Sequence, residues 1–331
     1  MSNIQIFLSD THFGVRANSI NWLESQKAFI YNQFIPYLKK LERNNTVEIF
    51  HLGDVFDSRS SISPMICKEA NLMLEEISCH CDMFTILAGN HDFFSPIEGN
   101  DNSTSLEMLP CMWRDNENIE ILTEGCSYIG DKAACIPWFE FHNPKKLKSI
   151  LDRVKNIETI LTHTDLDHLD PEIQKIIGDK NIITGHIHIP DIDEKHHHYT
   201  LGSCYSLNFA DANSERGFWQ TKDWDLSTLE FIENRESIMF HRINEEALTK
   251  EPNFNEQDYI ELTLKENIYN LPSTQETIKH YYANYPHFTV VVMQNEIEFN
   301  ESELEDSSIY TIVKNACPEN LRDKLDIVKE D

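Results

Sequence analysis

Carboxylate, imidazole and amide side chains follow short apolar stretches at several points in the first 190 residues. The apolar stretches 4–8, 47–52 and 83–88 each end in such a polar loop. The side chains placed in this way are Asp10, His12, Asp54, Asn90, His163, His186 and His188. Aspartate, histidine and asparagine without a cysteine thiolate suit divalent ions such as Mn, Fe or Zn. Because one catalytic ion typically takes about three protein ligands, this set predicts two ions that share a ligand.

The spacing also predicts how these side chains converge. In open α/β sheets, ligands bind at the carboxyl ends of the strands. Asp10 and His12 are separated by one residue, as are His186 and His188. Residues i and i+2 of an extended backbone point the same way, so we expect each pair to face the site together. Any one of these polar fragments alone is more often an ordinary turn. The prediction of a metal site rests on the ordered set of fragments.

The elements that must position these residues alternate along the chain. Apolar stretches, including 159–162 and 181–185, are separated by helix-like stretches at 19–43 and 65–78, which predicts an α/β layered fold. From about residue 250, a second region contains a strand-like stretch at 258–264, a helical one around 273–284 and a further strand at 286–294. We expect a main domain over 1–245, a small α+β capping region over 246–294, an acidic linker over 295–308 and a helical tail over 309–331.

Taken in order, the motifs D-x-H, G-D-x-x-D, G-N-H-D, a single His and G-H-x-H resemble those of the calcineurin-like metallophosphoesterases. The resemblance implies a two-layer β-sandwich flanked by helices and a dinuclear metal site. It implies one ion held by Asp10, His12, Asp54 and His188, and a second held by Asp54 as bridge with Asn90, His163 and His186. The metal implied is manganese, with magnesium, iron and zinc as alternatives.

Two longer segments are similar to a narrower branch of that family. "GDVFDSRSSISP" and "LGSCYSLNFADANSERGFW" (201–219) resemble segments of the SbcD-type recombination-repair nucleases, and among these the nuclease subunits of T-even phage recombination endonucleases. The resemblance covers roughly residues 3–235. It implies a metal-dependent exonuclease or endonuclease that acts on DNA, forms a homodimer and works with an SMC-type (SbcC-like) ATPase. The tail 309–331 would dock on that ATPase or pack on its own domain.

The Gly-Asn-His-Asp stretch then gains specific roles. His91 would stand beside the ions and protonate the leaving alkoxide, or stabilise the charge on the phosphoryl group. Asp92 would orient the His91 ring. Asp57 and Arg59 are expected to contact substrate phosphates, with orientation of a metal ligand as the alternative role for Asp57.

Composition limits the possible partners and locations. The chain has 331 residues and a formal net charge of −28, whereas isolated nucleic-acid-binding domains usually present a basic face. Any DNA therefore needs help from bound cations, a basic partner or local basic stretches such as 38–43 and 143–148. The eight cysteines are scattered, which indicates reduced thiols. No apolar stretch is long enough to span a bilayer and no signal peptide is evident, so we expect a cytoplasmic protein (in the host-cell cytoplasm if phage-encoded) without a membrane partner.

Two other functions remain open. A phosphoprotein phosphatase is disfavoured, because the chain reads GDVFDSR, GNHD and His163-Thr164-Asp165 where those enzymes differ. A nucleotide or small-molecule phosphodiesterase is harder to exclude, and the acidic charge favours it over a free-standing DNA-binding protein. A catalytically inactive scaffold usually loses metal ligands, whereas all of those expected here are present.

Overall fold

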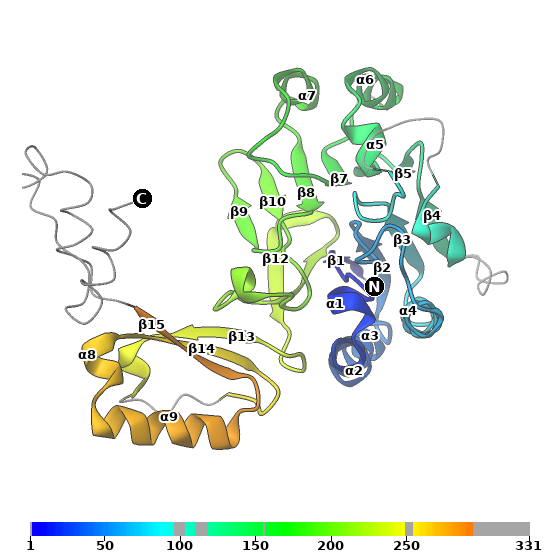
Figure 1. Ribbon diagram of the computed structural model, residues 1–331. Coiled ribbons are helices and arrows are strands. Elements are labelled where there is room, and N and C mark those ends of the chain that lie inside the picture. The colour runs from blue at the N-terminus through cyan, green and yellow to red at the C-terminus, as the bar shows by residue number, and fades with distance from the viewer. Residues whose placement is uncertain (1, 96–102, 110–117, 155, 249–253, 294–331) are drawn as a thin grey trace, which may run out of the picture. The chain divides into compact units, whose positions relative to one another are not determined.

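The computed structural model describes residues 2–95, 103–109, 118–154, 156–248 and 254–293 (Figure 1). The chain divides into two compact units. The first comprises Met1–Arg242 with Asn253–Ile260, and the second comprises Ile243–Pro252 with Glu261–Asp331. The acidic linker and helical tail expected over 295–308 and 309–331 lie outside the described residues.

The first unit contains a six-stranded sheet with strand order β12-β11-β1-β2-β3-β4. Four of its strands are parallel: β1 (Ser2–Leu8), β2 (Asn45–His51), β3 (Met83–Leu87) and β4 (Ile119–Leu122). The hairpin of β11 (Gly217–Lys222) and β12 (Asp225–Glu233) adds antiparallel strands beside β1. The carboxyl ends of β1, β2 and β3 therefore lie at one edge of the sheet, as the sequence pattern predicts.

A second six-stranded sheet has the order β5-β6-β7-β8-β10-β9. Its parallel strands are β6 (Ala133–Cys135), β7 (Thr159–His163), β8 (Asn181–Gly185) and β10 (His198–Thr200). The short strands β5 (Ser127–Ile129) and β9 (Asp191–Asp193) pair antiparallel at the two edges. Almost every residue of β7 and β8 is buried, as expected of parallel strands that are covered on both faces.

The two sheets pack face to face through a shared apolar core. Alternation along β1 shows this directly, because Phe7 joins Leu161 and Ile183 of the other sheet in one buried cluster. Its neighbours Ile6 and Leu8 belong to a different cluster on the opposite face. The expected two-layer sandwich is confirmed.

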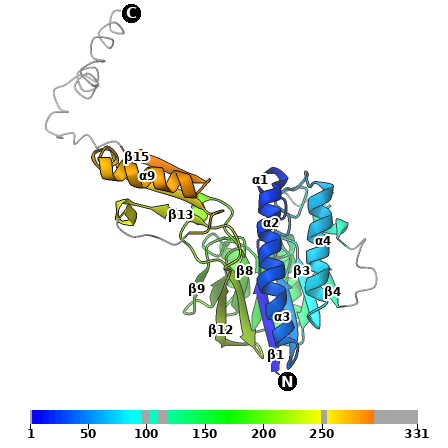
Figure 2. The same cartoon turned by 90° about the horizontal axis from the view of Figure 1, so that it is seen from below.

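Helices cover the outer face of each sheet. The first sheet is covered by α2 (Ile20–Ala28), a π-helical turn (Phe29–Phe34), α3 (Ile35–Leu41) and α4 (Pro64–Ser78), and Figure 2 shows α2 and α3 as one rod beside α4. A single turn, α1 (Val15–Asn18), precedes them. The second sheet is covered by α6 (Pro144–Arg153) and α7 (Pro171–Ile177), with α5 (Trp138–Phe141) beside β7. Short 3-10 turns occur at Ser105–Met108, Phe209–Asp211 and Glu245–Leu248.

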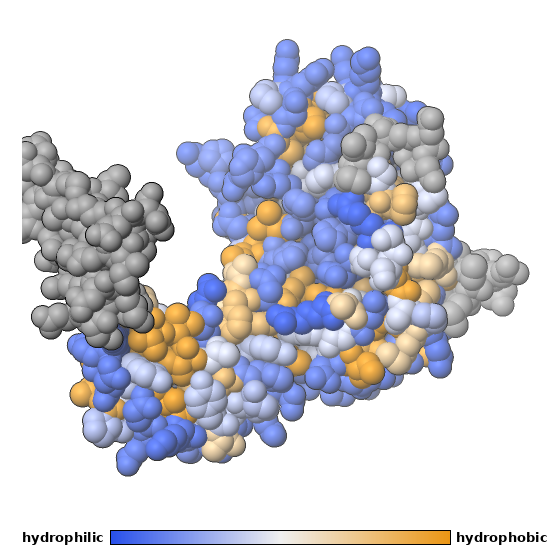
Figure 3. Space-filling model, viewed as in Figure 1, coloured by the Kyte–Doolittle hydropathy of each residue, from blue (hydrophilic) through white to orange (hydrophobic). Residues whose placement is uncertain are grey.

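A third, smaller sheet has the order β13-β14-β15. Its strands are β13 (Phe240–Ile243), β14 (Tyr259–Lys265) and β15 (Phe288–Met293), with α8 (Glu266–Tyr269) and α9 (Pro272–Asn284) between the last two. Helix α9 is anchored by Tyr281, whose ring stacks on Phe288 with centroids 4.9 Å apart. Figure 3 shows hydrophobic surface on the second unit, where Val291, Val292 and Met293 are exposed.

Candidate dinuclear metal site

The predicted ligand residues lie in the loops that follow β1, β2, β3, β7 and β8 or at the last residue of a strand. Both sheets therefore contribute, and their parallel strands end at a common edge. Overlapping groups of possible ligand atoms result: Asp10 with His12 and His188, Asp54 with His163 and His186, and, between these two, His12 and Asp54 with His91. The residues brought together are Asp10, His12, Asp54, Asn90, His163, His186 and His188.

The first group joins Asp10, His12 and His188. Nε2 of His12 lies 3.7 Å from Oδ1 of Asp10 and 3.2 Å from Nε2 of His188. Nε2 of His188 lies 3.8 Å from the same Asp10 oxygen. Ligand atoms bound to one ion at about 2.0–2.2 Å stand roughly 3–4 Å apart, so these separations suit a common divalent ion.

The second group joins Asp54, Asn90, His163 and His186. Nε2 of His163 lies 3.3 Å from Oδ2 of Asp54 and 3.1 Å from Oδ1 of Asn90. The Asn90 oxygen lies 2.9 Å from Nδ1 of His186. Oδ2 of Asp54 is also 3.7 Å from Nε2 of His12, so this carboxylate links the two groups.

The donor chemistry of these groups fits cations. Oδ1 of Asp10 is buried, and none of the residues that the structure describes forms a hydrogen bond with it. The His163 ring donates from Nδ1 to the carbonyl oxygen of Leu52, 2.6 Å away, which directs Nε2 toward the Asn90 oxygen and leaves Nε2 to bind a cation once it has lost its proton. Buried acceptors that face one another are unfavourable unless a donor or a cation lies between them. The residues would therefore hold two divalent ions, with Asp54 shared.

Charge pairing supports the same arrangement. Burial favours the neutral acid at Asp54, but His163 and His12 outweigh it and hold the pKa of Asp54 well below its usual range. Burial likewise opposes charge on His163, but Asp54 and Asp10 prevail and raise the pKa of this ring to about 9. At His186, burial and the neighbouring His163 lower the pKa to about 4. Asp54 and His186 are thus held in the forms that bind a metal ion, whereas His163 must release its Nε2 proton when an ion binds.

The backbone that carries these ligands is not extended, which corrects one expectation. Asp10, His12, Asp54 and His186 all have positive φ angles, of 55°, 40°, 54° and 83°. Each expected pair does face the site, but the extended backbone assumed for it is wrong, because the chain turns sharply beyond each strand. Left-handed backbone is unfavourable for residues with a Cβ atom and is concentrated at functional sites, where the surrounding structure imposes it.

Glycines allow these loops to approach one another. A Cβ atom at Gly89 would lie 2.3 Å from Oδ1 of Asp54, and one at Gly185 would lie 1.8 Å from Oγ of Ser9 and 2.8 Å from Oδ2 of Asp10. Both glycines directly precede predicted ligands, in Gly-Asn-His-Asp and in Gly-His-Ile-His. Their lack of a side chain lets the two groups of ligands meet.

Comparison with known families decides the identity. The family model described as calcineurin-like phosphoesterase matches residues 6–213, which contain every predicted ligand. The chain belongs to this family. As a member, it is a hydrolase of phosphoester bonds with candidate metal-ligand groups at the carboxyl edge of its sheets.

Solved structures and curated proteins add little detail on this phosphoesterase. A phosphopantetheinyl hydrolase from Mycobacterium tuberculosis is 12% identical, with a TM-score of 0.35, and the match covers 61% of this chain and 90% of that one. A 5′-nucleotidase from Candida albicans is 14% identical, with a TM-score of 0.34, and the match covers 68% of this chain and 52% of that one. No curated protein matches. Among the described residues, no helix is long and apolar enough to cross a membrane.

His91 stands beside the shared carboxylate of the phosphoesterase site. Its backbone N–H donates to Oδ1 of Asp54 at 2.8 Å, and its ring centroid lies 5.0 Å from that of His12. Nδ1 of His91 lies 2.7 Å from the carbonyl oxygen of Asp57, which fixes the proton on Nδ1. Nε2 is therefore the ring atom left to act on a substrate.

The prediction that Asp92 orients the His91 ring is wrong. The Asp92 carboxylate is fully buried and accepts backbone N–H groups of Val55, Phe56 and Gly89 at 2.9–3.3 Å. Burial, followed by the charge of Asp54, raises the pKa of Asp92 to about 7. Asp92 thus ties together the two loops that carry Asp54 and Asn90, and the Asp57 carbonyl performs the role expected of it.

The two predicted substrate contacts lie at the rim of the site. The Asp57 side chain is 33% exposed, and its Oδ1 lies 3.5 Å from Nδ1 of His12, so Asp57 lies beside a ligand as the alternative reading expected. Arg59 is half-buried in the loop that follows. That these two residues contact substrate remains a prediction.

Two supporting residues were not predicted from the sequence. Oδ1 of Asp211 lies 3.8 Å from Nδ1 of His188, while the other Asp211 oxygen accepts the backbone N–H of Leu207 at 2.8 Å. Arg216 is fully buried and donates to the carbonyl oxygen of His188 and to Oγ of Ser203. Both lie within the 201–219 segment, whose Asp and Arg stand among polar residues without the strand-end pattern that marks the ligands.

Proposed function

We propose that this phosphoesterase is the metal-dependent DNA nuclease subunit of a recombination or repair complex that contains an SMC-type ATPase. Support comes from the family, whose members hydrolyse phosphoester bonds, and from the segments "GDVFDSRSSISP" and "LGSCYSLNFADANSERGFW", which resemble those of SbcD-type nucleases. A homodimer is part of the same proposal, and manganese is the proposed metal.

The observation that carries the proposal is the placement of His91. Its Nδ1 is held by the Asp57 carbonyl, and its backbone is held by Asp54, so Nε2 is presented at a fixed position beside the ligands. Hydrolysis of a phosphodiester expels an alkoxide, which is a poor leaving group. A proton donor held beside it lets it leave as an alcohol. His91 in its protonated form would deliver that proton from Nε2. When bound, two divalent ions supply the activation of water and the neutralisation of phosphoryl charge.

The remaining residues act by positioning. Asp92 holds the loops of Asp54 and Asn90 together through backbone N–H groups. Asp211 and Arg216 anchor the loop of His188. A site assembled in this way meets its substrate with little reorganisation, which is the main source of electrostatic catalysis.

The acidic balance of the chain favours help from a partner. Lys39, in the basic stretch 38–43, lies 3.6 Å from Glu76, and Lys146, in the stretch 143–148, lies 2.8 Å from Glu140. These lysines are therefore partly neutralised by their own protein. With a net charge of −28, we propose that the ATPase partner supplies most of the affinity for DNA.

A nucleotide or small-molecule phosphodiesterase is the second candidate, and the same charge favours it. A small phosphodiester binds at the metal site and the residues around it, and does not require the long basic surface that DNA requires. The two candidates share the chemistry and differ in the size of the substrate.

The test is degradation of end-labelled linear double-stranded DNA by the purified protein with Mn²⁺, beside a His91→Ala variant. Mn²⁺-dependent cleavage that is lost in the variant supports the nuclease. Cleavage that persists in His91→Ala rules out the proposed proton donor. Absence of DNA cleavage together with hydrolysis of bis(p-nitrophenyl) phosphate moves the assignment to the second candidate, unless adding the ATPase partner restores DNA cleavage.

A further inference from the structure

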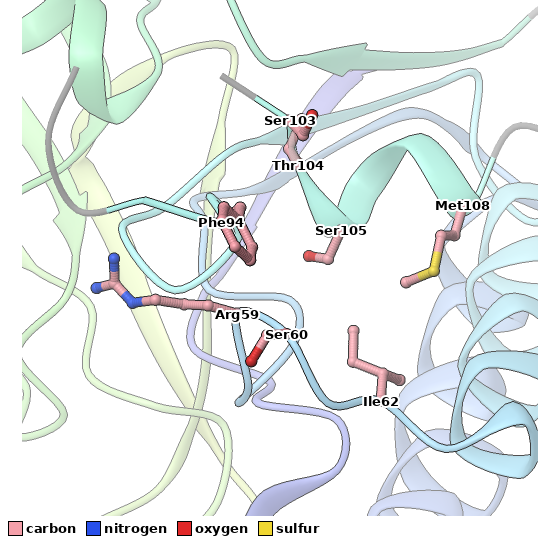
Figure 4. A pocket seen from close by; sticks show the side chains of 8 residues that line it. All are labelled: Arg59, Ser60, Ile62, Phe94, Ser103, Thr104, Ser105 and Met108. Atoms are coloured by element: carbon pink, nitrogen blue, oxygen red, sulfur yellow. The ribbon is translucent and has the colours of Figure 1, made fainter. Parts of the chain in front are cut away.

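A hollow of about 420 Å³ is lined in part by the loops that follow Asp57 and His91 (Figure 4). Its wall includes Arg59, two residues beyond the Asp57 carbonyl that holds His91, and Phe94, three residues beyond His91 itself. Backbone hydrogen bonds from Phe94 N to Ser103 O (3.0 Å) and from Ser105 N to Asp92 O (2.8 Å) bind the far wall to the same loop. The hollow is therefore continuous with the catalytic loop.

The walls combine the apolar side chains of Phe94, Met108 and Ile62 with the positively charged Arg59. Phe94 is 58% exposed and Met108 is 41% exposed, so both large apolar side chains in the wall are accessible to a ligand. Figure 4 shows Phe94, Ser105, Met108, Ile62 and Ser60 around the hollow, with the Arg59 guanidinium pointing away from Ile62 and Met108. Among the described residues that line it, none is acidic, although the chain has 56 acidic residues against 28 basic ones.

The Arg59 guanidinium has one donor that is not used within the described part of the chain. Its Nη1 atom is buried and has no hydrogen-bond partner among the described residues. Guanidinium groups are well suited to phosphate, which they bind through paired N–H donors. A guanidinium with an unused donor and an exposed phenylalanine in the wall of the same hollow are suited to hold a phosphate and an aromatic base of one nucleotide.

We propose that this hollow is a nucleotide subsite that takes one unpaired nucleotide next to the scissile phosphate. The base would stack on Phe94 and lie against Met108 and Ile62, and Arg59 would contact the adjoining phosphate. The volume falls within the roughly 300–1,000 Å³ of small-molecule sites. Base–aromatic stacking tolerates every base, so the subsite would act without sequence preference. This inference rests on the proposed phosphodiester hydrolysis and specifies its substrate as a strand whose reacting nucleotide is unstacked.

The test compares two phosphodiesters that share a leaving group: thymidine 5′-(p-nitrophenyl phosphate), and methyl p-nitrophenyl phosphate, which lacks the nucleoside. In the wild type with Mn²⁺, kcat/KM should favour the thymidine ester. In Phe94→Ala that ratio should fall by about tenfold through KM, and Phe94→Trp should restore it. Tyr282→Ala, which removes an aromatic side chain of similar exposure (56%) outside the hollow, should keep the wild-type ratio.

General damage to the protein would lower both activities and leave their ratio unchanged. An unchanged ratio in Phe94→Ala therefore overturns the subsite. If the wild type hydrolyses neither ester, the proposed function fails, and calorimetric titration with thymidine 5′-monophosphate then judges the subsite alone. About tenfold weaker binding by Phe94→Ala than by wild type supports it, and equal binding overturns it.

Discussion

Oδ1 of Asp211 lies 3.8 Å from Nδ1 of His188, while Nε2 of the same ring faces the Asp10 carboxylate. Asp211 thus stands behind a predicted ligand in the position from which a carboxylate fixes the orientation of a metal-binding imidazole. The segment 201–219 therefore serves the site without containing any of its ligands.

The first prediction follows from that contact. Asp211→Asn should weaken Mn²⁺ binding by about 10–100-fold, because His188 loses the charge that orients it. Titration calorimetry measures this effect, with Asp225→Asn as the control, since Asp225 is an exposed aspartate in a hairpin turn. Equal Mn²⁺ affinity in Asp211→Asn and wild type would remove Asp211 from the site.

Close approach of the loops provides the second prediction. Gly89→Ala should abolish tight metal binding, because the added Cβ would lie 2.3 Å from an Asp54 oxygen and 2.4 Å from the Asp54 nitrogen. Gly130→Ala is the matched control, since its Cβ would meet nothing within 4 Å and its φ of +57° would cost only about 1 kcal/mol of stability. Retention of Mn²⁺ by Gly89→Ala would show that the two loops are not packed as described.

Asp92 provides the third prediction. Asp92→Ala should lower the free energy of unfolding by about 3 kcal/mol or more, because buried backbone N–H groups lose their acceptor. Asp57→Ala, at the half-exposed rim, should change it by less than about 1 kcal/mol. Urea unfolding without metal measures both. A stable Asp92→Ala protein that is defective only in kcat would restore the original idea that Asp92 serves the His91 ring.

Strain beside the site provides the fourth prediction. Arg16, Ala17 and Asn18 have φ angles of 55°, 57° and 62°, and the Arg16 guanidinium lies 5.1–5.3 Å from the ring centroids of Trp22, Phe240 and Tyr259. Ala17→Gly should raise the free energy of unfolding by about 1 kcal/mol, because glycine adopts left-handed backbone without strain. Ala70→Gly, within α4, should lower it by a similar amount. Thermal denaturation of the two variants measures both changes in stability. Destabilisation by Ala17→Gly would contradict the left-handed backbone described at this position.

Much of the site could be predicted because polar residues interrupt apolar strands at recognisable points. Asp54, His163 and the Gly-Asn-His stretch each follow a short stretch rich in apolar residues, so strand ends and side-chain chemistry are visible together in the sequence. The sandwich follows for the same reason, since β1, β2, β3, β7 and β8 lie within a residue or two of the predicted strands.

The remaining features depend on tertiary contacts that have no local pattern. The sequence places Asp92 next to His91, but the carboxylate turns toward the backbone of Val55 and Phe56, on a loop that is distant in the sequence. Asp211 and Arg216 reach His188 from a segment without regular periodicity. Asp10 and His12 have left-handed backbone where the loops crowd together. The alternation of side chains along a strand does not predict such a conformation.

Sharing of Asp54 between two groups of ligands is the central claim, and counting bound metal tests it most directly. Purified wild-type protein equilibrated with Mn²⁺ and measured by native mass spectrometry should hold two ions per chain. Asp54→Asn should hold at most one tightly, because Oδ2 of Asp54 lies within 3.3–3.7 Å of a ligand atom from each group. A single ion in the wild type, or two tightly held ions in Asp54→Asn, would contradict the account.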